Sequence, residues 1–283
     1  MGFKNTLLPV ATLLQSKGNL LDLSQPVVMG IININPDSFY AASRKQDTEA
    51  VLMQAGKMIR EGAAILDIGG ASTRPGAGVI TPDEERNRIL PAIAAISKQF
   101  PQTWISVDTY HASVAEAAVQ AGAHMVNDIS AGSFDEQMLQ TVARLKVPYI
   151  AMHLRGSAAS MHEQYQYDNI TLEVIDELRK VCERCQAAGI TDLILDPGFG
   201  FAKKAAQSFE LLNHMGLLRL LGKPLLAGLS RKSMIYKSLD TDAAQALNGT
   251  TALHMVALQQ GSQMLRVHDV QAAAEAIRLF GML

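Results

Sequence analysis

The stretch Leu-Ile-Leu-Asp-Pro-Gly-Phe-Gly-Phe-Ala-Lys, residues 193–203, combines a short apolar run, a carboxylate and a tight turn. Three aliphatic residues in a row are typical of the end of a buried parallel strand, and Asp196 follows where such a strand leaves the core. The proline and the two glycines predict an irregular turn whose backbone approaches a flat ligand, with two phenylalanines as apolar faces. We interpret the stretch as a site for a planar heterocycle with N–H donors along one edge. The alternative is that Asp196 only caps the turn or the next helix.

The same pattern, an aliphatic or β-branched run that ends in a polar residue, recurs along the chain. It predicts strands at 27–32, 65–68, 104–107, 125–127, 149–152, 193–195, 225–227 and 264–267. Helical patterns alternate with them, at 48–60, from 81 onward, 112–121, 135–145, 169–188, 207–221, 243–260 and 270–280. The helix from Thr81 opens with a capping box and a proline at its first position. Eight such units predict an α/β protein with a (β/α)8 TIM barrel.

The domain organisation follows from the length and the absence of a linker sequence. The chain has 283 residues, of which 48% are hydrophobic, enough to bury the core of one barrel-sized domain. We expect a short N-terminal extension over 1–26, with a strand at 20–23 that closes the bottom of the core, and a single barrel domain over 27–283.

Charge and cysteine content restrict the partners. The formal net charge is −2, with cationic residues spread among acids, so no nucleic-acid or anionic-membrane surface is indicated. No apolar run reaches the roughly 18 residues of a membrane span. Cys182 and Cys185 fall inside a helical pattern and read as reduced residues of a cytoplasmic protein. Small molecules are therefore the expected partners.

A barrel of this kind gathers the residues that follow its strands on one face, where such enzymes bind substrates. These residues are Asn33, Asp67, Asp108, Asn127, His153, Asp196, the run 230–233, Arg266 and His268. Burying so many polar groups is unfavourable without partners, which indicates a ligand. The long connections at 33–47 and 69–81 are candidates for lids over the site.

The last two strand ends predict a phosphate site. Ser230-Arg-Lys-Ser233 follows the seventh strand, and Arg266 and His268 lie on the same side of the eighth. Arg266 has an alternative role as the partner of a strand-end aspartate, and His268 has one as a structural histidine.

Four strand-end side chains, Asp108, Asn127, Asp196 and Lys232, are suited to the edge of a flat amidine-like ring. Paired carboxylates also fit glycoside hydrolysis, which we rank lower because the only tryptophan, Trp104, lies within a predicted strand and not beside the site. Met152 and His153 read as a core residue followed by a pocket wall.

These motifs resemble dihydropteroate synthase, a family of folate biosynthesis, over residues 21–279. The matching motifs are Asn33-Ile-Asn-Pro-Asp-Ser-Phe39, Asp67-Ile-Gly-Gly-Ala-Ser-Thr-Arg-Pro-Gly76, Ser106-Val-Asp-Thr109, Asn127-Asp-Ile-Ser130, Met152-His-Leu-Arg-Gly156, Asp196-Pro-Gly-Phe-Gly-Phe201, Ser230-Arg-Lys-Ser233 and Arg266-Val-His-Asp269. The resemblance implies a transferase that condenses 6-hydroxymethyl-7,8-dihydropterin pyrophosphate with p-aminobenzoate, through an SN1-like pterin cation, to give 7,8-dihydropteroate and pyrophosphate. It also implies a homodimer and a target of sulfonamides.

By position, the resemblance assigns roles to individual residues. The pterin set is Asp108, Asn127, Asp196 and Lys232, with Asp67 and Met152 also in the substrate site. The pyrophosphate set is Asn33, Arg266 and His268, with Mg²⁺ near Asn33. Thr73 and Arg74 resemble a segment that binds phosphate and closes the site, and Phe39, Phe201 and Ser233 resemble the p-aminobenzoate pocket. The catalytic set that follows is Asn33, Asp108, Lys232, Arg266 and His268.

The sequence departs from the family pattern in the two long connections. Ala41-Ala42-Ser43 stand where Asp-Gly-Gly is usual, Ala71 replaces a glutamate, and Asn35 replaces a common threonine. Two alternative functions stay open, and the loss of both acids bears on the first of them. One is a non-catalytic pterin-binding paralogue, and the other is a barrel that transfers a methyl group from methyltetrahydrofolate, although its substrate lacks the phosphate that the 230–268 corner suits.

Overall fold

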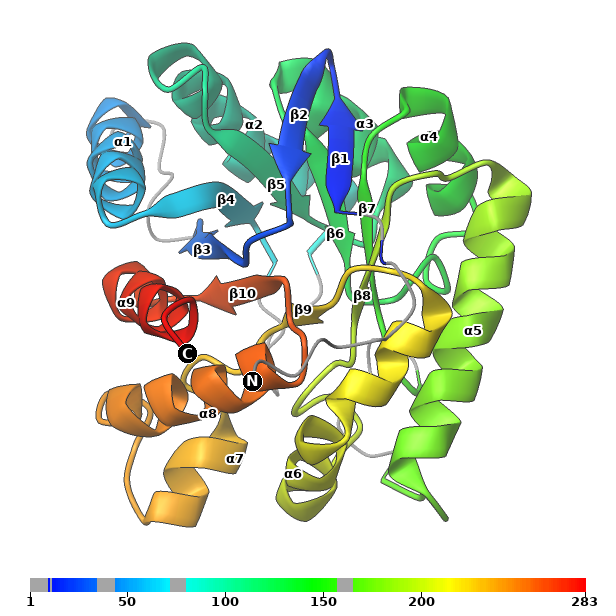
Figure 1. Ribbon diagram of the computed structural model, residues 1–283. Helices are drawn as coiled ribbons and strands as arrows, with labels where there is room; N and C mark the ends of the chain where they lie inside the picture. Colours follow the sequence, from blue (N-terminus) through cyan, green and yellow to red (C-terminus); the bar gives the residue numbers. More distant parts are fainter. Residues whose placement is uncertain (1–9, 11, 35–43, 72–79, 157–164) are drawn as a thin grey trace.

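Eight parallel strands form a closed barrel inside a ring of helices (Figure 1). The computed structural model describes residues 10, 12–34, 44–71, 80–156 and 165–283, with the backbone alone for 44–47. The barrel strands are β3 (Val27–Asn33), β4 (Ala63–Gly69), β5 (Trp104–Asp108), β6 (Met125–Asp128), β7 (Tyr149–Met152), β8 (Leu193–Asp196), β9 (Leu226–Ala227) and β10 (Met264–Val267). They pair in the order β8-β7-β6-β5-β4-β3-β10-β9. A parallel bridge between Leu195 and Leu225 joins the two ends, so the predicted (β/α)8 barrel is confirmed.

The helices follow the predicted order, but some of their boundaries differ. They are α1 (Arg44–Arg60), α2 (Pro82–Gln99), α3 (Ala112–Ala121), α4 (Met138–Leu145), α5 (Ile170–Ala188), α6 (Ala205–Asn213), the 3-10 helix η2 (Met215–Leu221), α7 (Ser233–Tyr236), the 3-10 helix η3 (Lys237–Leu239), α8 (Leu247–Gln259) and α9 (Val270–Phe280). The capping box at Thr81 is present, with Glu84 as its partner.

Two helices begin later than predicted because an aspartate first forms a turn. Asp135 accepts hydrogen bonds from the N–H groups of Ala112 and Gln137, which delays α4 to Met138. Asp242 accepts from two following N–H groups ahead of α8. The helix predicted over 207–221 is divided into α6 and η2, and the short α7 and η3 were not predicted.

An antiparallel hairpin precedes the barrel and covers one end of it. Its strands are β1 (Leu13–Ser16) and β2 (Asn19–Asp22), drawn in blue in front of the barrel strands in Figure 1. The predicted strand at 20–23 corresponds to β2, whereas β1 was missed. Leu14 and Leu23 are buried against one inward side chain from each barrel strand. That layer consists of Met29, Ile65, Trp104, Met125, Ile150, Ile194, Leu226 and Met264.

Trp104 lies within a strand, as predicted. It is the first residue of β5, and it is buried in this interior layer at the hairpin end. Its indole is therefore unavailable for stacking on a sugar at the opposite end, which agrees with the low rank of glycoside hydrolysis.

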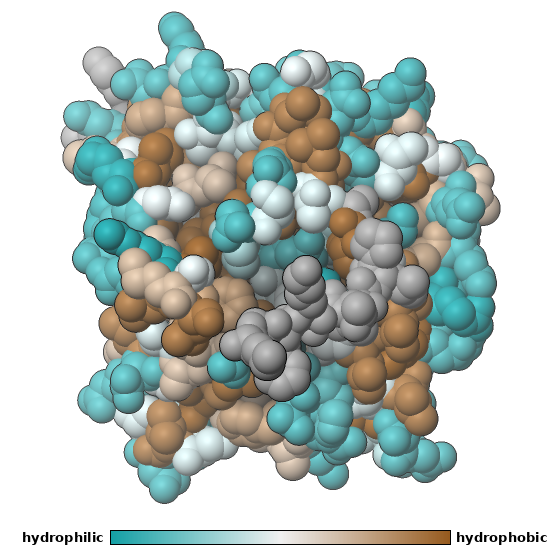
Figure 2. All heavy atoms as spheres, viewed as in Figure 1, coloured by the Kyte–Doolittle hydropathy of each residue, from teal (hydrophilic) through white to brown (hydrophobic). Residues whose placement is uncertain are grey.

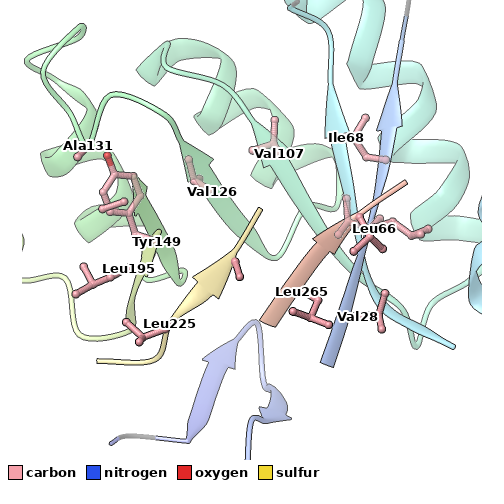
Figure 3. Packing of buried hydrophobic residues seen from close by; sticks show 14 of the residues in the cluster. Val28, Leu66, Ile68, Val107, Val126, Ala131, Tyr149, Leu195, Leu225 and Leu265 are labelled. Carbon is pink, nitrogen blue, oxygen red and sulfur yellow. The ribbon is translucent and has the colours of Figure 1, made fainter. Parts of the chain in front are cut away.

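Alternation along each strand separates two sets of buried residues. Val28, Leu66, Val107 and Leu265 lie an odd number of positions from the interior-layer residue of their strand and belong to the larger core between barrel and helices (Figure 3). On the face seen in Figure 2, hydrophilic and hydrophobic residues are interspersed. Among the described residues, no helix is both long and apolar enough to cross a membrane.

Candidate active site

Strand alternation brings most of the predicted site residues to the open end of the barrel interior. Each lies an even number of residues beyond a member of the apolar layer, so its side chain points the same way. The residues placed by this rule are Asp67, Asp108, Asn127, Met152, Asp196, Arg266 and His268. The apolar layer therefore forms a floor, and the polar groups stand above it.

Arg266 is the centre of a charged cluster. Its Nε donates to Asp67 Oδ2 at 2.6 Å, and its Nη2 donates to Asp108 Oδ2 at 2.5 Å. Asn127 Nδ2 also donates to Asp67 Oδ2, at 3.2 Å. The alternative role of Arg266 as the partner of strand-end aspartates is thus present in the structure. Asp67 Oδ1 is buried and has no hydrogen-bond partner in the described part of the chain, which leaves an acceptor beneath the site.

Negative charge exceeds positive charge in this part of the barrel. Burial raises the pKa of Asp108 to about 7, against the opposing effect of Arg266 and with help from the neighbouring carboxylates of Asp67 and Asp196. Burial also raises the pKa of Asp196, and Lys232 opposes that rise. A ligand that brings N–H donors or a cation would relieve both carboxylates.

The turn after β8 carries Asp196 into the site. Gly198 N–H donates to Asp196 Oδ1 at 2.7 Å, and Asp196 Oδ2 has no hydrogen-bond partner among the described residues. Gly198 has φ +69°, and a Cβ there would lie 2.2 Å from the carbonyl oxygen of His153, so only glycine fits. The turn thus presents one free carboxylate oxygen beside a backbone too close to β7 for any side chain.

Lys232 follows β9 and reaches this turn from the other side of the junction between β8 and β9. Its Nζ donates to the carbonyl oxygen of Phe199 and lies 4.7 Å from the centroid of the Phe201 ring. Burial lowers the pKa of Lys232 to about 8, and Asp196 opposes that fall. Asp196 and Lys232 of the predicted pterin set are therefore neighbours, and Phe201 of the predicted p-aminobenzoate pocket lies beside Lys232.

A small apolar cluster lines the same space, apart from the main core. Met152 and Ile129 are buried there, with Tyr110, Leu154 and Phe201 packed against them. Sequence reasoning found Met152 and Phe201 but missed Ile129, Tyr110 and Leu154. Their place just after strand ends was a usable signal.

The expected phosphate corner is only partly as predicted. The backbone N–H of His268 donates to Ser230 Oγ at 3.1 Å, and Nδ1 of the exposed His268 ring lies 3.1 Å from the same oxygen. Arg231, counted among the cationic donors of this corner, instead pairs with Asp269 at 2.7 and 2.8 Å and donates to the carbonyls of Ala243 and Ala244. The positive charge of Arg231 is therefore neutralised by Asp269 and is not directed at a phosphate. Ser233 is exposed at the start of α7.

Asn33 ends β3 beside this cluster and is exposed. A Cβ on Gly69 would lie 3.7 Å from Asn33 Oδ1 and 3.6 Å from Asp108 Oδ2, so both oxygens flank the same glycine. The described residues contain no group of three or more His, Cys, Asp or Glu side chains that could hold a metal. Mg²⁺ commonly binds through one or two protein oxygens plus water and substrate phosphates, and the oxygens present fit that mode.

Three predicted site residues, Phe39, Thr73 and Arg74, lie outside the described residues, as do Asn35 and Ala41. Ala71 is described and half-buried.

Glu85 of α2 is 1% exposed and accepts a hydrogen bond from Thr109 at 3.1 Å. Burial raises the pKa of Glu85 to about 7. Glu85 was not predicted as a site residue, because a glutamate in the first turn of a helix usually faces solvent.

Comparisons with known proteins agree with this geometry. Residues 29–268 match the family described as pterin binding enzyme. The dihydropteroate synthase of Escherichia coli (strain K12) is 39% identical over 266 residues, 93% of this chain and 94% of that protein. Two solved structures of Xanthomonas albilineans dihydropteroate synthase are also similar. The one with 4-aminobenzoic acid is 39% identical with a TM-score of 0.88, covering 96% of this chain and 98% of that one. The one in complex with 7,8-dihydropteroate is 37% identical with a TM-score of 0.84, covering 95% and 98%. The chain belongs to the pterin binding enzyme family and resembles dihydropteroate synthases over nearly its whole length.

Proposed function

We propose that the chain condenses 6-hydroxymethyl-7,8-dihydropterin pyrophosphate with p-aminobenzoate, giving 7,8-dihydropteroate and pyrophosphate. The observation that carries this proposal is the buried Asp196 carboxylate, with one free oxygen, between Lys232 and the apolar wall of Met152 and Phe201. A carboxylate there accepts two N–H donors from the aminopyrimidinone edge of a pterin, a charge-assisted pair that few other flat rings offer.

The polar residues above the apolar layer have different roles in the reaction. Asp196, Asn127 and Lys232 orient the pterin, and the ring lies against Met152 and Phe201. The bond between the pterin methylene carbon and the pyrophosphate oxygen breaks, and the electron pair leaves with pyrophosphate. The amine nitrogen of p-aminobenzoate then forms the new C–N bond to the methylene carbon, and the proton that this nitrogen loses passes to solvent water. Asp67 and Asp108, the two carboxyl groups paired with Arg266, are placed near the cation that develops on the pterin.

The leaving pyrophosphate is assigned to the corner of Arg266, His268 and Ser230. Asn33 would hold Mg²⁺ together with phosphate oxygens of the substrate, and the bound ion would supply positive charge to the departing group. The p-aminobenzoate pocket is assigned to Phe201 and Ser233, with Phe39 as a further predicted member. A homodimer, a cytoplasmic location and inhibition by sulfonamides belong to the same proposal.

A non-catalytic pterin-binding protein is the second candidate, favoured by Ala41 and Ala71 in place of two acids. The deciding experiment measures formation of dihydropteroate from the two substrates with Mg²⁺, in the natural chain and in Ala41→Asp. We expect turnover from both. If a loop carboxylate stabilises the cation in relatives, Ala41→Asp should be faster by a factor on the order of 10² to 10³. Tight pterin binding without product from either protein would favour the non-catalytic candidate.

The methyl-transfer alternative is tested separately with pyrophosphate. Calorimetric titration should detect pyrophosphate binding to the purified chain, because the proposed reaction releases this ion at the Arg266 corner. A barrel that handles only methyltetrahydrofolate has no phosphate to bind there, so the absence of binding would favour that reading.

A further inference from the structure

A second ionic cluster, buried at Lys203 and His153, lies directly behind the turn that carries Asp196. Lys203 is only 4% exposed, and its ammonium group has three acceptors. Nζ lies 2.9 Å from the carbonyl oxygen of Gly198, 3.1 Å from that of Phe201 and 2.9 Å from His153 Nδ1. Burial lowers the pKa of Lys203 to about 7, and Asp196 opposes that fall. In its ammonium form the side chain has three N–H donors, so each is used once. The function described above assigns nothing to this lysine.

His153 connects the lysine to a helix. Burial, together with the nearby charge of Lys203, lowers the pKa of His153 to about 4, so the ring is neutral at pH 7. Because Nδ1 accepts from Lys203, Nε2 carries the proton and donates to Glu177 Oε2 of α5, at 2.8 Å. Glu177 is held in turn by Arg155, whose Nε donates to Oε1 at 2.9 Å. The cluster therefore links a cation to a carboxylate through a neutral imidazole, and its hydrogen-bond directions are fixed.

The turn needs such support because of its backbone conformation. Gly198, Gly200 and Ala202 all have positive φ, at 69°, 77° and 49°. Ala202 is in the left-handed region without being glycine, a conformation that is unfavourable by about 1 kcal/mol or more. Lys203 bonds a carbonyl near each end of this turn. On the other side, the N–H of His153 donates to the carbonyl oxygen of Asp196 at 2.8 Å.

We propose that Lys203 is a positioning residue for pterin recognition, which fixes the Asp196–Phe201 turn through the carbonyl oxygens of Gly198 and Phe201, with His153 as its third acceptor. Through these bonds it sets where the Asp196 carboxylate and the Phe201 ring meet the substrate. The inference rests on the proposed function, since it assumes that this pocket receives a pterin.

The test compares two lysine variants with the natural chain. Lys203→Met keeps the length of the side chain and removes its three donors. Lys17→Met is the control, because Lys17 donates to the carbonyl oxygen of Val119 at the opposite, hairpin-covered end of the barrel. The affinities of hydroxymethylpterin and of pyrophosphate are measured by calorimetry, well below the midpoint of thermal unfolding of each variant.

We expect Lys203→Met to bind hydroxymethylpterin about 10-fold or more weakly while its affinity for pyrophosphate stays within about 2-fold, because the Ser230 and His268 corner does not contact Lys203. Lys17→Met should keep both affinities. Equal pterin binding by Lys203→Met and the natural chain would overturn the inference, and so would a parallel loss of both ligands, which indicates a purely structural lysine.

Two further outcomes keep the inference separable from other failures. If the natural chain itself does not bind hydroxymethylpterin, the proposed function fails rather than the role of Lys203. If Lys203→Met does not fold, Lys203→Gln replaces it, since the amide retains a donor for one carbonyl. That variant should show an intermediate loss of pterin affinity, and an undiminished affinity contradicts the inference.

Discussion

Asp196 offers the most direct test at the scale of a single residue. Asp196→Asn should weaken hydroxymethylpterin binding by about 10- to 100-fold, because one oxygen is replaced by an N–H₂ group that meets the N–H donors of the ligand, and a hydrogen bond to a charged group contributes about 1.5 to 3 kcal/mol. Isothermal titration calorimetry measures the loss. Asp192→Asn is the control, since Asp192 accepts from Gln15 N–H at the hairpin end. Unchanged pterin affinity in Asp196→Asn contradicts the assignment.

Arg266 has two functions that the same variant separates. Arg266→Ala should raise the KM for the pyrophosphate substrate by about 10-fold or more and leave the binding of free hydroxymethylpterin nearly intact. It should also lower the free energy of unfolding by about 3 to 5 kcal/mol, because the buried Asp67 loses its cation. Steady-state kinetics and urea unfolding measure the two effects. An equal loss for both ligands would show that Arg266 acts only as a partner of the aspartates.

Much of the site was predictable at this scale. Asp196, Asp108, Asn127 and Arg266 were found because parity along a strand and position at its end are both properties of the local sequence. Lys203 was not found, because its third acceptor, His153, joins the two carbonyl oxygens of the turn only when β7 and β8 are paired. The pairing of Arg231 with Asp269 was also missed, because the local sequence around a predicted phosphate site does not indicate a partner 38 residues away.

Among the helices, α2 supplies a pH-dependent contribution to stability. Burial raises the pKa of Glu85 from 4.5 to about 7, so the folded state holds a proton that the unfolded state has lost. A raised pKa stabilises the fold below pH 4.5, and this contribution is lost as the pH rises through 7. The change is about 3 kcal/mol at most. Glu85→Gln should therefore reduce the fall in the free energy of unfolding between pH 4.5 and 7.

Urea unfolding at several pH values checks this expectation. Asp108, whose pKa is also raised to about 7, keeps part of the slope in the variant. Glu84→Gln is the control, because Glu84 is the exposed neighbour that completes the capping box. A slope that Glu85→Gln leaves unchanged would show that Glu85 is already ionised in the folded protein.

At the same scale, element boundaries show where local signals suffice. The start of α2 was predicted because its cap lies within four neighbouring residues, Thr81 to Glu84. The late starts of α4 and α8 were missed because Asp135 and Asp242 carry turn signals that compete with the helical pattern around them. β1 was missed because a two-stranded hairpin owes its stability to the layer that it covers rather than to its own sequence.

For the whole molecule, the hairpin should affect stability without affecting the site. Leu23 is 1% exposed and packs against the interior layer at the end of the barrel opposite Asp196. Leu23→Ala should lower the free energy of unfolding by about 2 to 5 kcal/mol, from lost burial and the cavity left behind. Calorimetric pterin affinity should stay the same. A large loss of affinity in the folded variant would mean that the floor transmits strain to the pocket.

The barrel closes at a weak point. β9 has two residues, and the residues just before it make the bridge of Leu225 to Leu195 of β8 and a hydrogen bond from Leu195 N–H to the carbonyl oxygen of Pro224 at 2.9 Å. Asp196 stands on one side of this joint and Lys232 follows the other. A ligand that binds both residues therefore links the two sides of the junction between β8 and β9. The empty barrel should therefore open there first, and amide hydrogen exchange at Leu195 should slow when the pterin is bound, while exchange in β4 and β5 stays as it was. Bound substrate would then stabilise the closure of the barrel at the point where backbone hydrogen bonds contribute least.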